Sequence, residues 1–223
     1  MRKNQKKERL AAIVEALKEI YPSAECALEY EGDPWRLLVM GRLSAQCTDA
    51  RVNVVCRDLF RRFPTARDMA EASVEEIGEI IRPCGLYRMK AENLKAASQM
   101  LVSEYEGRLP DTMEELLRFP GVGRKIANLL LGDVFGKPAV VTDTHCIRIC
   151  GRLGMYPTAL RDPYKIEQIL WELLPEGEGA DFCHRIVWFG RETCTARAPH
   201  CDTCPLASRG LCEQRNREAS RGN

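Results

Sequence analysis

The amino-acid sequence predicts an all-α fold, and three observations support this prediction. Apolar residues recur at helical spacing in several segments. Serine or threonine stands three residues before glutamate where two further segments begin. Glycine and proline separate these segments, and the best candidate strand, residues 139–141, is too short to be convincing. The pattern predicts about ten helices with short connections.

The predicted helices follow one another along the chain. Three of them carry apolar residues at positions i, i+3, i+4 and i+7, within residues 10–20, 52–63 and 166–173. Two short helices are expected to begin at capping boxes, formed by Ser73 with Glu76 and by Thr112 with Glu115. The second of these short helices should cover residues 113–118, and a longer apolar helix is expected over residues 126–135.

Composition is that of an ordinary soluble protein and excludes a membrane-spanning one. Hydrophobic residues make up 45% of the 223 residues, and no apolar run approaches the roughly 20 residues that cross a bilayer. The formal net charge is only +1, so any surface that binds nucleic acid must be a local patch. Residues 2–9 are polar and largely basic, which predicts no signal peptide and a cytoplasmic location.

Four cysteines near the C-terminus predict a bound metal. Six, two and seven residues separate them, so short loops can bring together Cys194, Cys201, Cys204 and Cys212. In the cytoplasm such a group is more typical of a metal site than of disulfides. The spacing leaves an iron–sulfur cluster and a zinc ion both open, although zinc sites usually contain two short cysteine pairs. The other seven cysteines are expected to fill the core, among them Cys47, Cys56, Cys146 and Cys150.

Residues 119–125, with the sequence Phe-Pro-Gly-Val-Gly-Arg-Lys, predict a tight hairpin between two helices. Gly121 and Gly123 flank Val122, and glycine permits a left-handed backbone and the close approach of another backbone. The helix that follows, which begins near Arg124, offers N–H groups that bind phosphate. Such a motif would hold a nucleic-acid backbone without reading its bases, although an ordinary helix connector can have the same sequence.

Two residues beside this hairpin are candidates for chemistry. Lys125 lies in the first turn of the second helix, where the helix dipole, Arg124 and partial burial would favour a neutral, nucleophilic amine. The plainer interpretation is a surface lysine. Asp143 directly precedes a helical stretch and is a natural N-cap. A capping carboxylate can also face a cleft and stabilise a cation-like transition state.

Together these motifs resemble the endonuclease III family of DNA glycosylases, within the helix–hairpin–helix superfamily. Residues 119–154 resemble the core motif of that family, and the four C-terminal cysteines resemble its four-iron cluster motif. Residues 43–49 and 85–87 resemble two further family segments. The resemblance covers most of the chain. One departure is the gap between Cys204 and Cys212, which is longer than the family's usual gap.

The resemblance implies two domains around a cleft. A six-helix barrel would comprise residues 27–137 and carry the hairpin and Lys125. The second domain would join residues 1–26 to residues 138–223, hold a 4Fe-4S cluster on the four cysteines, and bring Asp143 to the cleft. The cluster is expected to be structural, because the implied reaction contains no redox step.

The resemblance also implies a substrate and a reaction. A damaged base would be flipped out of double-stranded DNA, while Gln46 and Leu86 fill the gap in the stack. Without the resemblance, Gln46 reads as a polar helix end and Leu86 as a core leucine. Lys125 would attack the sugar and displace the base, β-elimination would cut the strand, and Asp143 would stabilise the cationic sugar. The DNA backbone would be held by Gly121, Val122, Gly123 and Arg124.

We therefore expect a monomeric base-excision-repair glycosylase with apurinic/apyrimidinic lyase activity toward oxidised pyrimidines. Its partner would be double-stranded DNA with a damaged base or an abasic site, and no membrane. A monofunctional mismatch glycosylase is the first alternative, but that branch lacks the lysine. A non-catalytic DNA-binding iron–sulfur protein is the second, and it would have no need of both Lys125 and Asp143.

Overall fold

The structure, a computed structural model, describes residues 2–23 and 25–216. Twelve α-helices and two 3-10 helices lie wholly within these ranges, which contain no strand, so the all-α prediction is confirmed. The expected number of about ten helices was too low, because helices of a single turn show little apolar periodicity. Two of these are α7 (Met113–Leu116) and α12 (Pro205–Ser208). No helix in the described ranges is long and apolar enough to cross a membrane.

The chain forms two compact units. One comprises residues 26–136, and the other joins residues 1–25 to residues 137–223. Each boundary lies one residue before the position expected from the sequence. The N-terminal segment therefore belongs with the C-terminal half of the chain, which periodicity alone does not indicate.

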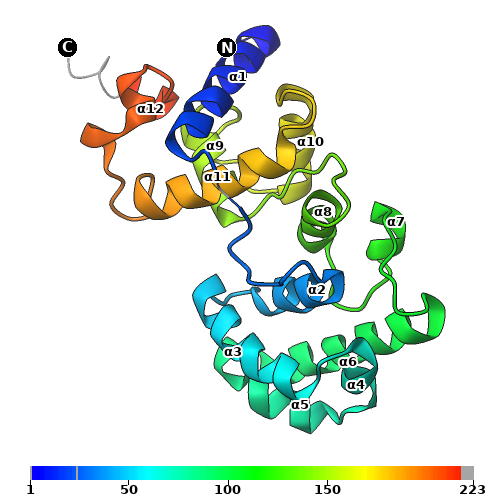
Figure 1. Cartoon of the computed structure of the whole chain (residues 1–223). Coiled ribbons are helices and arrows are strands. Elements are labelled where there is room, and N and C mark those ends of the chain that lie inside the picture. The colour runs from blue at the N-terminus through cyan, green and yellow to red at the C-terminus, as the bar shows by residue number, and fades with distance from the viewer. Residues whose placement is uncertain (1, 24, 217–223) are drawn as a thin grey trace. The chain divides into compact units, whose positions relative to one another are not determined.

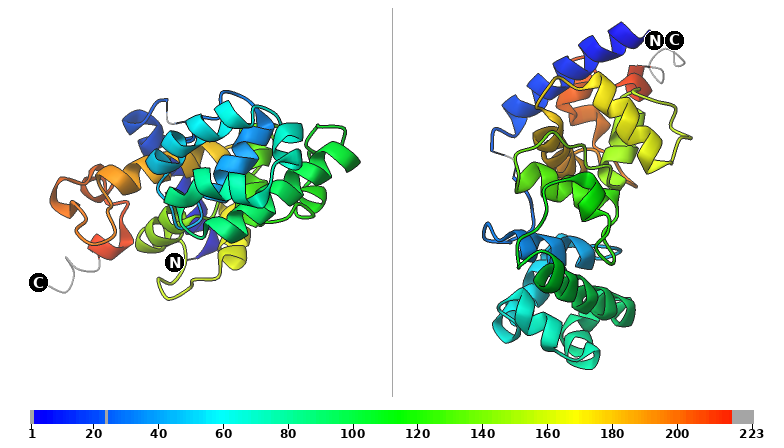
Figure 2. Two further views of the ribbon diagram at one scale, coloured as in Figure 1. Left: turned by 90° about the horizontal axis from the view of Figure 1, so that it is seen from below. Right: turned by 90° about the vertical axis from the view of Figure 1, so that its right-hand side faces the viewer.

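The unit of residues 26–136 contains seven α-helices, one more than the expected six. They are α2 (Pro34–Leu43), α3 (Asp49–Arg62), α4 (Ala66–Glu71), α5 (Val74–Ile81), α6 (Tyr87–Glu104), α7 and α8 (Arg124–Asp133). A 3-10 helix, η1 (Arg82–Cys84), connects α5 to the start of α6. Helices α4 and α5 pack along α6, and α2 packs on α8 (Figure 1; Figure 2).

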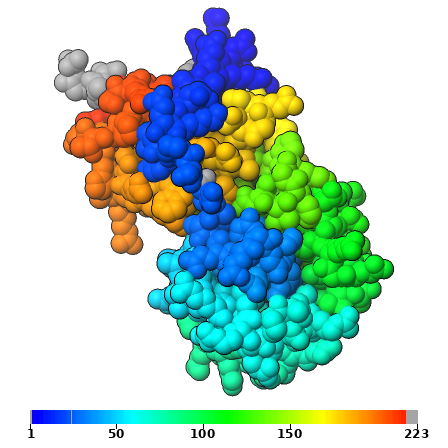
Figure 3. Space-filling view, in the orientation of Figure 1, coloured from blue at the N-terminus to red at the C-terminus, as the bar shows by residue number. Residues whose placement is uncertain are grey.

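The other unit is built on its longest helix, α1 (Lys3–Ile20). Its remaining helices are α9 (Thr144–Arg152), α10 (Pro163–Leu173), α11 (Gly179–Glu192), η2 (Cys201–Thr203) and α12. Helix α1 packs on α10 and α11, and α11 packs on α9. The space-filling view shows α1, in blue, against the yellow and orange segments of this unit (Figure 3). The predicted apolar stripe of α1 faces this core, since Leu10, Ile13 and Leu17 are fully buried.

Side-chain caps explain where several helices begin. At α5 the predicted capping box is complete, because Ser73 Oγ accepts from the Glu76 N–H at 3.1 Å and Glu76 accepts from the Ser73 N–H at 3.0 Å. At α7 only half of the predicted box forms. Thr112 Oγ1 accepts from the Glu115 N–H at 3.3 Å, but the Glu115 carboxylate accepts from the Thr112 hydroxyl in place of its N–H.

Two further expectations from the sequence need correction. Helix α7 ends at Leu116 and α8 covers Arg124–Asp133, so the second helix begins two residues earlier than expected and the first ends two residues earlier. Among the cysteines expected in the core, Cys26 and Cys47 are only half-buried, because they lie in the connections before and after α2. Cys56, Cys146 and Cys150 are buried, as expected.

Candidate active site and metal centre

The hairpin before α8 uses its two glycines in different ways. Gly121 has φ +79°, and a Cβ there would lie 2.5 Å from the Nε of Arg42, so the fold itself requires glycine. Gly123 has an ordinary φ of −103°, and a Cβ there would meet nothing within 4 Å. The left-handed backbone predicted for the glycines is therefore found at Gly121 and not at Gly123. Val122 anchors the hairpin in the core, where it is only 7% exposed.

The N-terminus of α8 is open to a ligand. Gly123 is the N-cap, and no side chain caps the helix there. The N-terminal end of a helix carries partial positive charge, and an uncapped end is a favourable place for an anion such as a phosphate. Because Gly123 also lacks a side chain, another molecule's backbone can approach this helix end closely.

Lys125 lies in the first turn of α8 and is exposed, so the predicted partial burial is wrong. The physical reason is the orientation of α8. The core-facing stripe of the helix is formed by Ile126, Ala127 and Leu130, and Lys125 lies outside that stripe. The fold does not depend on packing around Lys125, so its amine is available to a bound molecule.

Asp143 is the N-cap of α9, as predicted. Its Oδ1 accepts a 2.7 Å hydrogen bond from the backbone N–H of Cys146. Its second oxygen, Oδ2, accepts no hydrogen bond from the described residues, and the side chain is half-buried. One carboxylate can therefore cap the start of the helix and still present its other oxygen to another group. Lys125 and Asp143 belong to different units of the chain.

Gln46 and Leu86 share an unusual backbone conformation. Each has a positive φ, +57° for Gln46 and +49° for Leu86, which costs most side chains free energy. Gln46 is exposed in the loop after α2, and Leu86 is the N-cap of α6 with 52% of its surface exposed. The interpretation of Leu86 as a core leucine is therefore wrong. Both residues are available to an external partner.

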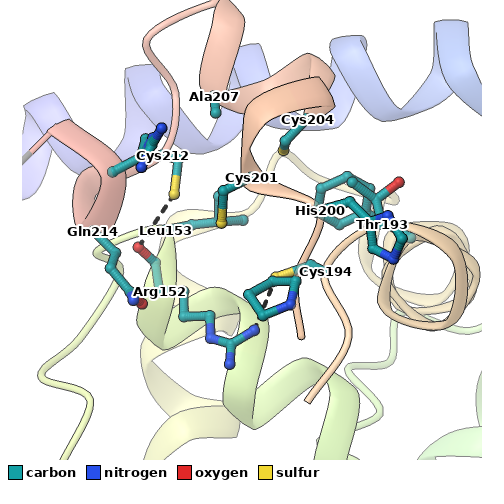
Figure 4. Close-up of a pocket in the computed structure, with 13 residues that line it drawn as sticks. Arg152, Leu153, Thr193, Cys194, His200, Cys201, Cys204, Ala207, Cys212 and Gln214 are labelled. Carbon is teal, nitrogen blue, oxygen red and sulfur yellow. Dashed lines mark hydrogen bonds between the residues drawn. The ribbon is translucent and has the colours of Figure 1, made fainter. Parts of the chain in front are cut away.

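Four sulfur atoms surround one pocket at the C-terminal end of the described chain (Figure 4). They come from Cys194 after α11, Cys201 in η2, Cys204 at the start of α12, and Cys212 beyond it. The tertiary structure thus brings together the cysteines that the sequence predicts to be metal ligands. Sequence reasoning missed Arg152, whose Nη1 donates to Cys194 Sγ at 3.3 Å and to the Thr195 carbonyl at 2.8 Å.

The chemistry of this pocket suits an iron–sulfur cluster. Burial raises the pKa of the Cys204 thiol, and the neighbouring Cys212 and Cys194 raise it further. A set of adjacent thiolates is therefore unfavourable without a positive centre, which cluster iron supplies. The guanidinium of Arg152 offers a hydrogen bond to a ligand sulfur, an interaction that tunes such clusters.

The long gap between Cys204 and Cys212 is folded and held in place. It contains α12, and α1 fastens the turn that follows. Arg9 of α1 donates to the carbonyls of Gly210 at 3.0 Å and Leu211 at 3.1 Å, and it pairs with Glu213 at 2.6 Å. The additional residues therefore leave Cys212 at the pocket.

Comparison with known proteins finds two matching family descriptions. Residues 39–176 match the family described as HhH-GPD superfamily base excision DNA repair protein. Residues 194–209 match the iron–sulfur binding domain of endonuclease III, a match that ends before Cys212. Cys212 nevertheless lines the same pocket as the other three cysteines.

Individual relatives match over nearly their whole length. The chain is 45% identical to endonuclease III of Synechocystis sp., with 91% of each chain covered. A solved non-covalent complex of endonuclease III with DNA is 36% identical, with a TM-score of 0.89 and coverage of 96% of this chain and 98% of that one. A trapped covalent intermediate of endonuclease III with DNA is also 36% identical, with a TM-score of 0.88 and coverage of 98% and 99%.

Proposed function

Because this chain belongs to the endonuclease III family of the HhH-GPD superfamily, we propose that it is a bifunctional DNA glycosylase and apurinic/apyrimidinic lyase. Its substrates are oxidised pyrimidines in double-stranded DNA. The iron–sulfur centre belongs to the same family assignment. A cytoplasmic location follows from the substrate and from the bacterial relatives.

The observation that carries this proposal is the position of Lys125. It follows the hairpin directly, lies in the first turn of an uncapped helix, and is exposed. A phosphate held at the start of α8 would bring the sugar of the same strand close to the lysine amine. The trapped covalent complex of a relative with DNA supports a nucleophile of this kind.

Catalysis by these residues proceeds through a Schiff base. The neutral Nζ of Lys125 attacks C1′ of the sugar, the glycosidic bond breaks, and the base leaves with the bonding pair and one of the amine's protons. The C1′–O4′ bond then opens, O4′ takes a proton that Asp143 relays from water, and a protonated C=N bond joins Lys125 to C1′. Asp143 stabilises the cationic sugar through its negative charge.

Strand cleavage follows from the same intermediate. The iminium makes the C2′ proton acidic. Water takes this proton, a C2′=C3′ double bond forms, and the C3′–O3′ bond breaks, so that the 3′ phosphate leaves with the bonding pair. Water then hydrolyses the C=N bond and frees Lys125. The glycines of the hairpin allow the DNA backbone to approach α8, and Gln46 and Leu86 fill the space left by the flipped base. The cluster serves as a structural support for the C-terminal segment.

Lys125 favours the bifunctional mechanism over a monofunctional one, because a glycosylase that uses only water as nucleophile needs no amine at this position. A non-catalytic DNA-binding protein is less consistent still, since α9 could be capped equally well by serine or asparagine. Neither alternative is favoured by a specific feature of the site.

Borohydride trapping of a Lys125→Gln variant tests the proposal. On duplex DNA with an oxidised pyrimidine, the unmodified protein should form a covalent adduct and cut the strand, whereas Lys125→Gln should do neither and still bind. Lys165→Gln is the matched control, because Lys165 is also an exposed lysine in the first turn of a helix. An adduct formed by Lys125→Gln would show that another amine is the nucleophile.

A further inference from the structure

A fully buried lysine joins the two loops that carry Gln46 and Leu86. Lys90 lies on α6 and has no exposed surface. Its Nζ donates to the carbonyls of Leu43 at 2.8 Å, Ala45 at 2.8 Å and Cys84 at 2.9 Å. An ammonium group has three protons, so these three bonds use all of them.

The acceptors show what Lys90 holds in place. Leu43 is the last residue of α2, and Ala45 directly precedes Gln46. Cys84 closes η1, two residues before Leu86. The backbone N–H of Lys90 also donates to the carbonyl of Leu86 at 3.1 Å. Lys90 is therefore bonded to both loops, in which Gln46 and Leu86 are the exposed non-glycine residues with positive φ.

No carboxylate pairs with Lys90 among the described residues. A buried charge without a counter-ion is costly, and three backbone carbonyls compensate for it only if they stay in place around it. Movement of either loop would leave the ammonium group or a carbonyl without its partner. Because losing one of these hydrogen bonds costs free energy, the two loops are held at a fixed spacing. The strained backbone conformations of Gln46 and Leu86 are held in place in the same way.

We infer that Lys90 is a positioning residue for base extrusion, which holds Gln46 and Leu86 at a fixed separation in the free protein. This inference rests on the proposed function of these two residues as the groups that fill the gap in the DNA stack. A preset separation means that the protein need not order the two loops while it expels a base. Preorganisation of this kind raises the rate of the step that uses it.

The test compares a Lys90→Met variant with the unmodified protein. Methionine is similar in length but cannot donate a hydrogen bond. Leu94→Ala is the matched control, because Leu94 lies one turn further along α6, is buried, and makes no contact that joins the two loops through hydrogen bonds. Both substitutions lower stability, but only Lys90→Met removes the link between the loops.

Four measurements follow. Amide hydrogen exchange of the free protein should become faster at residues 44–47 and 84–87 in Lys90→Met, and at these residues more than in Leu94→Ala. Base removal from duplex DNA should slow by about ten- to a hundredfold in Lys90→Met. Cleavage of a preformed abasic site should change by less than about threefold, because little extrusion is needed there. Fluorescence of 2-aminopurine opposite the lesion should report reduced extrusion.

Unchanged hydrogen exchange in the two loops would overturn the inference, and so would equal slowing on both substrates, or no slowing on either. Gln46→Ala and Leu86→Ala separate this failure from failure of the proposed function. If those two variants extrude bases normally, the assignment of Gln46 and Leu86 is wrong whatever Lys90 does. If they are defective and Lys90→Met is not, only the role of Lys90 is wrong.

Discussion

The backbone N–H of Cys146 donates a 2.7 Å hydrogen bond to the carboxylate of Asp143, so the proposed catalytic acid is also the cap of a helix. Substitutions of Asp143 can therefore act on stability, on catalysis, or on both. The two effects are separable, because asparagine caps a helix about as well as aspartate but carries no charge.

We expect Asp143→Asn to fold normally and to lose most base excision. Its free energy of unfolding should change by less than about 0.5 kcal/mol, since the cap remains. Its excision rate should fall by roughly 100- to 10,000-fold, the usual effect of removing a positioned acid or base. Asp143→Ala should lose both the helix cap and the catalytic charge, so its excision rate should fall and its stability should drop by about 1 kcal/mol. Full activity of Asp143→Asn would leave capping as the only role of this residue.

The metal centre should depend on the four clustered cysteines and on no others. The purified protein should be brown and contain about four irons per chain. Cys204→Ser and Cys212→Ser should each release iron, and Cys212→Ser is the more informative because Cys212 lies outside the matched iron–sulfur segment. Cys56→Ser is the control, a buried cysteine of the other unit, and should keep its iron. One zinc per chain in place of iron would contradict the assignment.

The two hairpin glycines should respond differently to alanine. Gly123→Ala should fold normally, because its φ is ordinary and its surroundings are open, but it should weaken binding to damaged and undamaged duplexes alike. Gly121→Ala should be less stable by at least about 1 kcal/mol, because a side chain there is strained at positive φ and collides with Arg42.

Binding to DNA should also show how the hairpin works. If the contact is with phosphates, affinity for undamaged duplex should fall steeply as salt is raised, through release of counterions. Fluorescence anisotropy at several salt concentrations measures this slope for the unmodified protein and for Gly123→Ala. An affinity that does not change with salt would exclude electrostatic contacts with the DNA phosphates.

Gln46→Ala and Leu86→Ala should slow base removal from duplex DNA far more than cleavage of a preformed abasic site. The side chains are exposed, so their loss should cost the fold little. They matter when a stacked base must be expelled and kept out. Single-turnover rates on the two substrates provide the comparison, and equal slowing on both would point to a direct role in chemistry.

Tyr21 should make stability depend on pH in the alkaline range. Its hydroxyl donates to Glu192 at 2.9 Å, and burial, followed by this hydrogen bond, raises the pKa of Tyr21 to about 12. A phenol titrates near pH 10 in an unfolded chain. The stabilising effect should therefore be complete below about pH 10 and decline as the pH rises toward 12. Thermal melts of Tyr21→Phe should show a smaller decline than those of the unmodified protein over this range.

The sequence by itself determined the helical class, the start of α5 at Ser73, the N-cap at Asp143 and the candidate ligands of the metal. These features depend on residues close together in the chain, through helical periodicity, local hydrogen bonds and short loops. Resemblance to a family supplied the roles proposed for Gln46 and Leu86, which no local pattern indicates. Their exposure and left-handed backbones became visible only in the structure.

Tertiary structure decided the features that join distant parts of the chain. Arg9 holds the turn before Cys212, about two hundred residues away, and Arg152 reaches Cys194 from another helix. Lys90 was one lysine among many in the sequence, and only folding surrounds it with three carbonyls. For Lys125 the sequence suggested partial burial, but the orientation of α8 leaves this side chain exposed. Burial and long-range hydrogen bonds depend on how helices pack, and a local sequence pattern does not specify that packing.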